Sequence, residues 1–243
     1  MIRNLSIFLI VLLLAYQASS CKKGVKAPPV QGPDTVGTTP PPPSDLPRTF
    51  LALGDSYTIG KGVDSALRFP AQTAALLKDK GIIIPRIEYL ATAGWTTLNL
   101  QNALLYLDAK AHYDMVTLLI GVNDQFEKGD TIGYRERFSQ LLVKSIQLAT
   151  GKRNHVFVVS IPDYSVTPFG GNSSATQKQL EQFNAINKEV AQQQSVNYLD
   201  ITDITRQAGK DLSLLIDDLL HPSGKQYALW SKALSPIMTN ALR

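Results

Sequence analysis

Cysteine is almost absent from this sequence, which has 243 residues and a single cysteine, Cys21. One cysteine excludes an intramolecular disulfide and a zinc site built from cysteine ligands. Concentrated positive charge is missing as well, because the formal net charge is +4 and the longest basic runs are pairs such as Lys22-Lys23. Binding to nucleic acid usually needs a basic face, so the composition gives that class of function little support.

Long apolar runs are missing except near the N-terminus. There Leu5–Ala15 is almost unbroken and follows a single positive charge at Arg3. The run is too short to span a bilayer comfortably, but it is typical of the apolar region of a signal peptide. Small residues then lead directly to Cys21, an arrangement that resembles the lipobox of bacterial lipoproteins, although Ala18 stands where leucine is more common. The resemblance implies acylation of Cys21; the alternative is an ordinary secreted protein cut near Ser20.

A proline-rich stretch follows this cysteine. Lys22–Pro47 has few large apolar side chains to bury and includes the run Pro40–Pro43. Such chain is semi-extended, at about 3 Å per residue, and acts as a spacer. We therefore predict a signal peptide over residues 1–20, a lipid-bearing cysteine and tether over residues 21–47, and a folded domain over residues 48–243. The envelope of the cell, with the domain anchored through lipid, is the expected location.

The pattern of the remaining chain predicts one α/β domain, since its length suits a single substantial core. Short apolar runs typical of buried strands alternate with longer segments that have helical spacing. Such alternation favours right-handed crossovers and a doubly wound parallel sheet. The expected strands are Phe50–Leu53, Ile87–Ala91, Met115–Ile120, Val156–Ile161 and Val196–Ile201. The expected helices are Phe69–Lys80, Thr97–Lys110, Tyr134–Thr150, Ala175–Gln194 and Gly224–Leu242.

Polar residues that follow these strands are the candidate functional residues, because functional sites in such sheets lie beyond the carboxyl ends of the strands. The first strand ends in G-D-S-Y, with Ser56 at the turn, and A-G-W-T-T follows the second, with Gly94. The third is followed by G-V-N-D, with Asn123, and the last helix is preceded by D-x-x-H-P, with His221. These four blocks, in this order, resemble those of the SGNH hydrolases, also called the GDSL esterase/lipase family. The resemblance covers Arg48 to the C-terminus.

The resemblance implies a three-layer α/β/α, flavodoxin-like fold with a doubly wound sheet of five parallel strands. It implies a serine esterase that works through an acyl-enzyme, with no metal or organic cofactor. Ser56 would be the nucleophile, and the oxyanion hole would consist of the Ser56 and Gly94 backbone N–H groups and the Asn123 amide. Tyr57 stands where the family name has leucine, a position that varies and carries no chemistry.

The residues themselves also support acyl transfer, which needs a nucleophile, a base and a group that orients the base. His221 is the best candidate base, because imidazole titrates near neutral pH and can pass a proton on to the leaving group. His112 and His155 are the other two histidines. His155 would lie at the wrong end of the fourth strand, and we expect both at the surface.

Asp218 is the candidate acid. It precedes His221 by three residues, so one short turn can bring its carboxylate onto the imidazole. Asp217 is one residue off this spacing and is expected to be solvated, and Asp163 is an alternative acid. The pattern Ser223-x-x-Gln226 predicts a capping box at the start of the last helix.

Four further residues are expected to have supporting roles. Asp124 is expected to hold the loop of Asn123. Trp95, next to Gly94, either lines an acyl pocket or packs, and Tyr227 and Trp230 are expected in the core.

The expected substrate is a small ester, either an O-acetyl group on a carbohydrate or a short acyl ester, hydrolysed by a monomer. A lysophospholipase or thioesterase activity is the enzymatic alternative. A glycan-binding lipoprotein without catalytic activity is the alternative from another class.

Overall fold

The computed structural model describes residues 46–127 and 129–243. The predicted signal peptide, Cys21 and nearly all of the tether lie outside these residues. Within the described part, one five-stranded sheet forms the centre of the domain, with the strand order β2-β1-β3-β4-β5 and every neighbouring pair parallel. The strands are β1 (Phe50–Gly54), β2 (Ile87–Ala91), β3 (Met115–Leu119), β4 (Val156–Val159) and β5 (Asn197–Leu199).

The three inner strands are apolar on both faces, and this is why they are the inner ones. Every residue of β1, β3 and β4 is buried, whereas β2 and β5 at the edges are only partly buried. Strands buried on both sides need helices on both sides. The predicted α/β class and the parallel five-stranded sheet are therefore confirmed.

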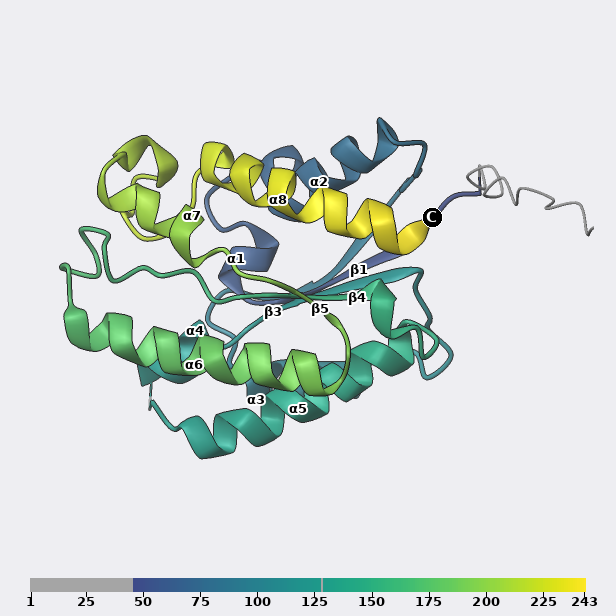
Figure 1. The fold of residues 1–243 in the computed structure, drawn as a ribbon, viewed down its shortest axis with the longest axis horizontal. Coiled ribbons are helices and arrows are strands. Elements are labelled where there is room, and N and C mark those ends of the chain that lie inside the picture. The colour runs from purple at the N-terminus through teal and green to yellow at the C-terminus, as the bar shows by residue number, and fades with distance from the viewer. Residues whose placement is uncertain (1–45, 128) are drawn as a thin grey trace, which may run out of the picture. The chain divides into compact units, whose positions relative to one another are not determined.

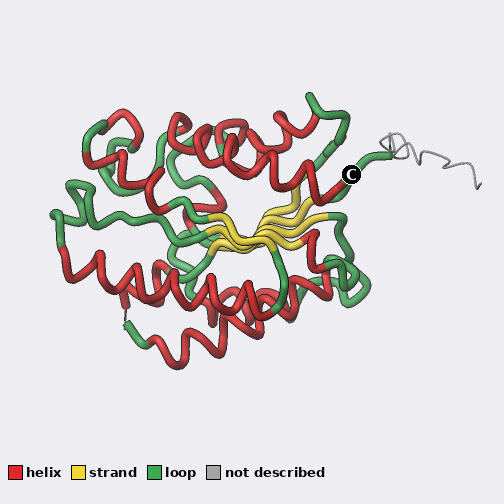
Figure 2. Tube along the Cα trace, in the orientation of Figure 1, coloured by secondary structure: helices red, strands yellow, loops and turns green. Residues whose placement is uncertain are grey.

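Helices cover both faces of the sheet, which gives the expected three layers (Figure 1; Figure 2). One layer contains α2 and α8, which pack on each other, and the other contains α3, α5 and α6, with α5 between its neighbours. The helices are α1 (Ser56–Ile59), α2 (Phe69–Lys78), α3 (Thr97–Leu104), α4 (Val122–Glu127), α5 (Thr131–Leu148), α6 (Ser174–Gln193), α7 (Thr202–Arg206) and α8 (Gly224–Leu242). Short 3-10 turns lie at Ser65–Leu67, Arg153–His155, Gln207–Gly209 and Leu212–Leu214.

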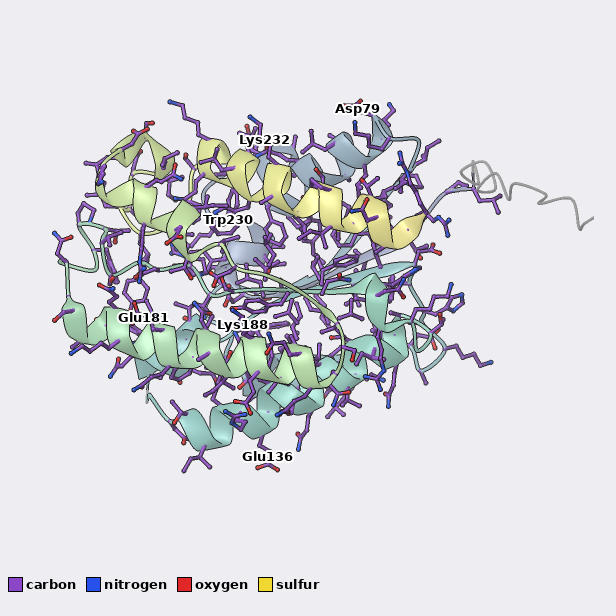
Figure 3. All side chains as sticks on the ribbon, viewed as in Figure 1. Asp79, Glu136, Glu181, Lys188, Trp230 and Lys232 are labelled. Carbon is purple, nitrogen blue, oxygen red and sulfur yellow. The ribbon has the colours of Figure 1, made fainter. Side chains whose placement is uncertain are left out.

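Aromatic side chains fill the layer between α8 and the sheet. Trp230 and Tyr227 are buried, as predicted, and their rings meet edge to face with centroids 5.0 Å apart. Phe69 of α2 packs on both rings, so α2 and α8 share one aromatic cluster. Figure 3 shows Trp230 on the inner side of α8, while the charged Lys232 of the same helix points outward. Burial of this apolar surface is what fixes α8, and with it the segment that precedes α8.

The structure differs from the predicted helices at some of their ends and in several additional short helices. The predicted helix over Thr97–Lys110 ends at Leu104. Asp108 then accepts a hydrogen bond from the Lys110 N–H, a local turn that aspartate favours. The helix expected from Tyr134 begins earlier, at Thr131, because the Asp130 carboxylate caps its first N–H groups. The short helices α1, α4 and α7 were not predicted at all.

Two local predictions were wrong. Ser223 precedes α8, but its hydroxyl donates to the Ser213 carbonyl 2.8 Å away, so the predicted capping box with Gln226 does not form. His155 is buried, not at the surface, and its Nδ1 lies 2.6 Å from the Asp114 carbonyl. Burial lowers the pKa of His155. His112 is exposed, as expected.

Within the described residues, none of the helices combines the length and the apolar character that crossing a membrane requires.

Candidate active site

Ser56 is the first residue of α1, directly after the sharp turn at Asp55 that ends β1. Asp55 caps the helix by accepting a hydrogen bond from the Tyr57 N–H at 2.9 Å, and Gly60 ends the helix in the left-handed conformation with φ 68°. Gly54 is required at the end of β1, because a Cβ there would collide with Thr58 and with the Leu119 carbonyl of β3. This close approach brings the turn directly beside the end of the neighbouring strand.

His221 is carried by a compact loop that precedes α8. The Asp218 carboxylate accepts hydrogen bonds from the backbone N–H groups of Leu220 and His221, at 3.0 and 2.9 Å. Leu219 takes the left-handed conformation, with φ 56°, which is uncommon for a residue with a side chain. The Ile216 N–H donates to the His221 carbonyl at 2.9 Å and closes the loop. Asp218 therefore builds the turn that presents the histidine.

The predicted nucleophile, base and acid form one hydrogen-bonded chain. His221 Nε2 lies 3.0 Å from Ser56 Oγ, and His221 Nδ1 lies 2.7 Å from Asp218 Oδ2. An Nδ1–H that donates to the carboxylate leaves Nε2 free to accept the serine proton. Ser56 and His221 are each only 5% exposed. The Tyr57 ring packs on the imidazole, with centroids 5.5 Å apart, and supports its orientation.

The electrostatics of the chain keep the imidazole neutral and the carboxylate charged. Burial lowers the pKa of His221, and this outweighs the opposing effect of Asp218. Partial burial acts to raise the pKa of Asp218, but hydrogen bonds from the His221 backbone, the His221 ring and the Leu220 backbone together lower it. A neutral imidazole beside an ionised carboxylate is the state in which a histidine can take a proton from a hydroxyl.

The alternative acids do not reach the imidazole. Asp217 is exposed, as expected. Asp163 is buried, but its carboxylate binds the Arg206 Nε at 2.7 Å and the Ser165 hydroxyl. The proposal of Asp163 as a substitute acid is therefore wrong, and its position after β4 serves to anchor Arg206 of α7.

Gly94 and Asn123 come together at the carboxyl edge of the sheet. Gly94 has φ 85°, a conformation that L side chains rarely adopt, in the turn after β2. Asn123 is near the start of α4, and its Nδ2 donates to the Trp95 carbonyl at 2.9 Å. An amide nitrogen carries two hydrogens, so this bond orients the group and leaves a second N–H available.

Asp124 holds this pair of segments together, as predicted. Its buried carboxylate accepts from the Thr97 N–H at 2.8 Å and from the Thr97 hydroxyl. Arg137 of α5 completes the network, with Nη2 3.2 Å from Asp124 Oδ1 and Nε 2.8 Å from Thr97 Oγ1. Thr97 lies in the A-G-W-T-T block but was assigned no role from the sequence, and Arg137 carries no motif that the sequence alone would single out.

A cavity of about 200 Å³ opens beside the nucleophile. It brings together Ser56, Gly94, Asn123 and His221. Its remaining lining residues are Tyr57, Lys61, Ala93, Val122, Phe126, Tyr164, Phe169 and Leu220. Trp95 is not among them, because its half-buried ring packs against the core. Of the two roles considered for Trp95, packing is the one observed.

Asp55, the residue before Ser56, is fully buried and electrostatically unusual. One carboxylate oxygen caps α1, and the other, Oδ2, has no hydrogen-bond partner among the described residues. Burial, with a further contribution from the charge of Asp124, raises the pKa of Asp55 to about 7. Because the folded-state pKa is higher than the ordinary value of 3.8, the folded protein binds the proton more tightly than the unfolded chain.

The raised pKa of Asp55 can be tested with Asp55→Asn, which keeps the capping oxygen and removes the charge. The wild type should lose stability relative to the variant as the pH rises from about 4 to about 7, with no further change above. Between about pH 5 and about pH 8 the difference should grow by roughly 3 kcal/mol. Urea denaturation of both proteins at several pH values measures it. A difference that is independent of pH would show that Asp55 is ionised throughout.

No cluster of His, Cys, Asp and Glu residues within residues 46–127 and 129–243 has the arrangement of a metal site.

The fold and the cavity define an α/β protein of three layers, with a serine, a glycine, an asparagine and a histidine at the carboxyl ends of its parallel strands. Residues 52–229 match the GDSL-like lipase/acylhydrolase family, and the chain belongs to it. It is thus a hydrolase of ester bonds, and the predicted enzyme class is confirmed.

Solved structures share the fold at low sequence identity. An acetylxylan esterase from Geobacillus stearothermophilus is 20% identical with a TM-score of 0.61, covering 79% of this chain and 94% of its own. TesA is 19% identical with a TM-score of 0.64, covering 80% and 99%. A lipase/acylhydrolase from Enterococcus faecalis is 18% identical with a TM-score of 0.63, covering 79% and 96%. No curated protein matches the chain.

Proposed function

We propose that the protein is a serine esterase that hydrolyses small carboxylic esters through an acyl-enzyme on Ser56. The observation that carries this proposal is the hydrogen-bonded chain from Asp218 through His221 to Ser56, which ends at the cavity. A hydroxyl becomes an effective nucleophile when an oriented base can take its proton.

The reaction follows from these positions. Ser56 Oγ attacks the ester carbonyl carbon while His221 Nε2 takes the hydroxyl proton, and Asp218 stabilises the imidazolium. The tetrahedral intermediate collapses, the bond to the alcohol oxygen breaks, and the same proton passes to that oxygen. Water then repeats the sequence on the acyl-enzyme, which releases the acid and restores Ser56.

The developing oxyanion needs donors, and we assign this role to the N–H groups of Ser56 and Gly94 and to the Asn123 amide. The turn at Gly94 and the bond from Asn123 to the Trp95 carbonyl support the assignment, because they hold both groups at the cavity. Preorganised donors of this kind stabilise negative charge without reorganisation during the reaction.

Asn123→Ala tests the oxyanion hole. The variant should lose about 10²–10³ in kcat, the typical effect of one donor, while the fold persists because Asp124 still anchors the loop. Steady-state hydrolysis of a short p-nitrophenyl ester measures the loss. Leu98→Ala, an exposed position on α3, is a control that should keep wild-type rates. Activity near wild type in Asn123→Ala would assign Asn123 to structure alone.

The size of the cavity favours a short acyl group. At about 200 Å³ it is smaller than the roughly 300–1,000 Å³ of sites that bury drug-sized ligands. O-acetyl groups on carbohydrate and short acyl esters both fit this limit. The lysophospholipase or thioesterase alternative gains support from Phe126 and Phe169, which are 64% and 51% exposed at the cavity and could extend an apolar surface beyond it.

A substrate panel separates these candidates. Acetylated sugars should be compared with acyl esters of increasing chain length under the same conditions. Rates that fall beyond the shortest acyl chains support the proposed function. Rates that keep rising with chain length would favour the lipid-hydrolase alternative and contradict the short-acyl proposal.

We also propose that the mature protein is anchored in the cell envelope through a diacylated Cys21, since two chains give stable membrane binding where one does not. A fatty-acid analogue supplied to cells should label the wild type and leave Cys21→Ser unlabelled. A wild type without label, or a labelled Cys21→Ser, would contradict the anchor and favour a secreted protein.

A further inference from the structure

The lining of the active-site cavity is asymmetric in charge. Among its described lining residues, Lys61 is the one lysine, arginine, aspartate or glutamate. Lys61 is exposed and makes none of the ion pairs found in the described part of the chain. The aromatic residues Tyr164, Phe169 and Phe126 form a continuous cluster, with neighbouring ring centroids 6.1 and 6.4 Å apart.

The backbone of Lys61 is fixed beside the nucleophile. Its N–H donates to the Ser56 carbonyl at 3.0 Å. It lies between Gly60 and Gly62, both in the left-handed region, with φ 68° and 81°. Gly62 is so close to Ile216 that a Cβ would collide with that side chain. Ile216 belongs to the loop that presents His221, so Lys61 stands where the nucleophile turn meets the histidine loop.

This position adjoins the loop that presents His221. His221 delivers its proton to the alcohol oxygen, so the alcohol part of the substrate has to lie near the imidazole. Burial lowers the pKa of His221, and the charge of Lys61 lowers it further, which agrees with this proximity.

The aromatic cluster comes from different elements. Phe126 is one helical turn after Asn123 on α4, and Tyr164 and Phe169 belong to the segment between β4 and α6. An apolar wall suits the acyl part of an ester, whereas an unpaired ammonium group suits an anion.

We propose that Lys61 is a specificity-determining residue that binds an anionic group, a carboxylate or a phosphate, on the alcohol part of the ester. The inference rests on the proposed serine esterase function and narrows it to esters of acidic alcohols. Acidic sugars and glycerol phosphates share this chemistry, and the experiment distinguishes them.

The test compares 4-acetoxybenzoate and 4-acetoxyphenyl phosphate with the neutral 4-acetoxybenzamide. The measured quantity is the ratio of kcat/KM for each anionic ester to that for the neutral ester. Effects of Lys61 on the His221 pKa act on all three esters and cancel in the ratio. Lys61→Gln should lower the ratio about three- to tenfold, chiefly through KM, and Lys61→Arg should restore most of it. The wild-type ratio should also fall at about 1 M salt, where the Debye length is ~3 Å.

Lys152→Gln is the matched control. Lys152 is exposed and lies in the turn before β4, at the amino ends of the strands, whereas the cavity lies at their carboxyl ends. It should leave the ratio unchanged. A ratio that does not change in Lys61→Gln, or that changes equally in Lys152→Gln, overturns the role of Lys61 while hydrolysis of 4-acetoxybenzamide still supports the esterase. Absence of turnover with all three esters would overturn both.

Two natural pairs then identify the source of the anion. Acetylated galacturonate is compared with acetylated galactose, and an acylglycerol phosphate with the corresponding monoacylglycerol. Dependence on Lys61 in the first pair assigns the site to acidic carbohydrate, and in the second pair to a phospholipid. Independence of Lys61 in both natural pairs counts against the proposal.

Discussion

Ser56→Ala should reduce the hydrolysis of a short p-nitrophenyl ester by at least about 10³-fold, to the limit of detection. The substitution removes the one hydroxyl that lies within hydrogen-bond distance of His221 Nε2 in the described chain. Among the described lining residues no other hydroxyl is hydrogen-bonded to His221, so the residual rate should reflect binding and the oxyanion donors.

The fold should survive this change. The cap of α1 is the Asp55 carboxylate, which binds the Tyr57 N–H and does not involve the serine hydroxyl. Ser139→Ala is a suitable control, since Ser139 Oγ bonds to the Arg135 carbonyl within α5 and lies away from the cavity. Thermal unfolding should be similar for both variants and the wild type. Undiminished turnover in Ser56→Ala would remove the proposed nucleophile.

Asp218→Asn should lower kcat by about 10³–10⁴. The asparagine oxygen can still accept from the N–H groups of Leu220 and His221, so the loop should keep its shape. The amide nitrogen, however, donates to Nδ1 and thus favours the tautomer with the proton on Nε2. That tautomer cannot take the proton of Ser56.

Asp217→Asn is the matched control. It removes the same charge from the neighbouring residue, whose side chain is exposed. Its kcat should stay within about twofold of the wild type, as expected for a surface charge. Steady-state rates of the two variants at the same pH provide the comparison. Equal losses would mean that kcat depends on the net charge near the loop and not on the bond to His221 Nδ1.

The positions of the candidate site residues could be predicted because they follow from strand ends and from chain order. Ser56 follows a buried apolar strand, and the motif around His221 precedes an amphipathic helix, so both were expected at the carboxyl ends of the parallel strands. The three-residue spacing from Asp218 to His221 was sufficient to predict their contact, since a single turn closes it.

Interactions between segments distant in sequence could not be predicted in this way. The bond from Asn123 to the Trp95 carbonyl and the salt bridge from Arg137 to Asp124 depend on how α3, α4 and α5 pack. Ser223 found a partner in the Ser213 carbonyl, and this contact replaced the local cap that its sequence pattern favoured.

The roles of the individual side chains in the cavity walls could not be predicted, because they belong to the segments that connect the predicted elements. Phe126 belongs to the short helix α4, and Phe169 to a segment without periodicity between β4 and α6. A role for Lys61 could not be predicted from the sequence, because its place beside the histidine loop depends on the contact of Gly62 with Ile216. Loops carry specificity, and their conformation depends on the scaffold beneath them.

The central claim is that Ser56 is the nucleophile of a serine esterase. Intact-mass spectrometry after reaction with a fluorophosphonate tests it most directly, because the reagent traps a serine that an adjacent base activates. The account predicts one adduct on the wild type, located on Ser56 by peptide mapping, and none on Ser56→Ala. An unmodified wild type, or an adduct that persists in Ser56→Ala, would contradict it.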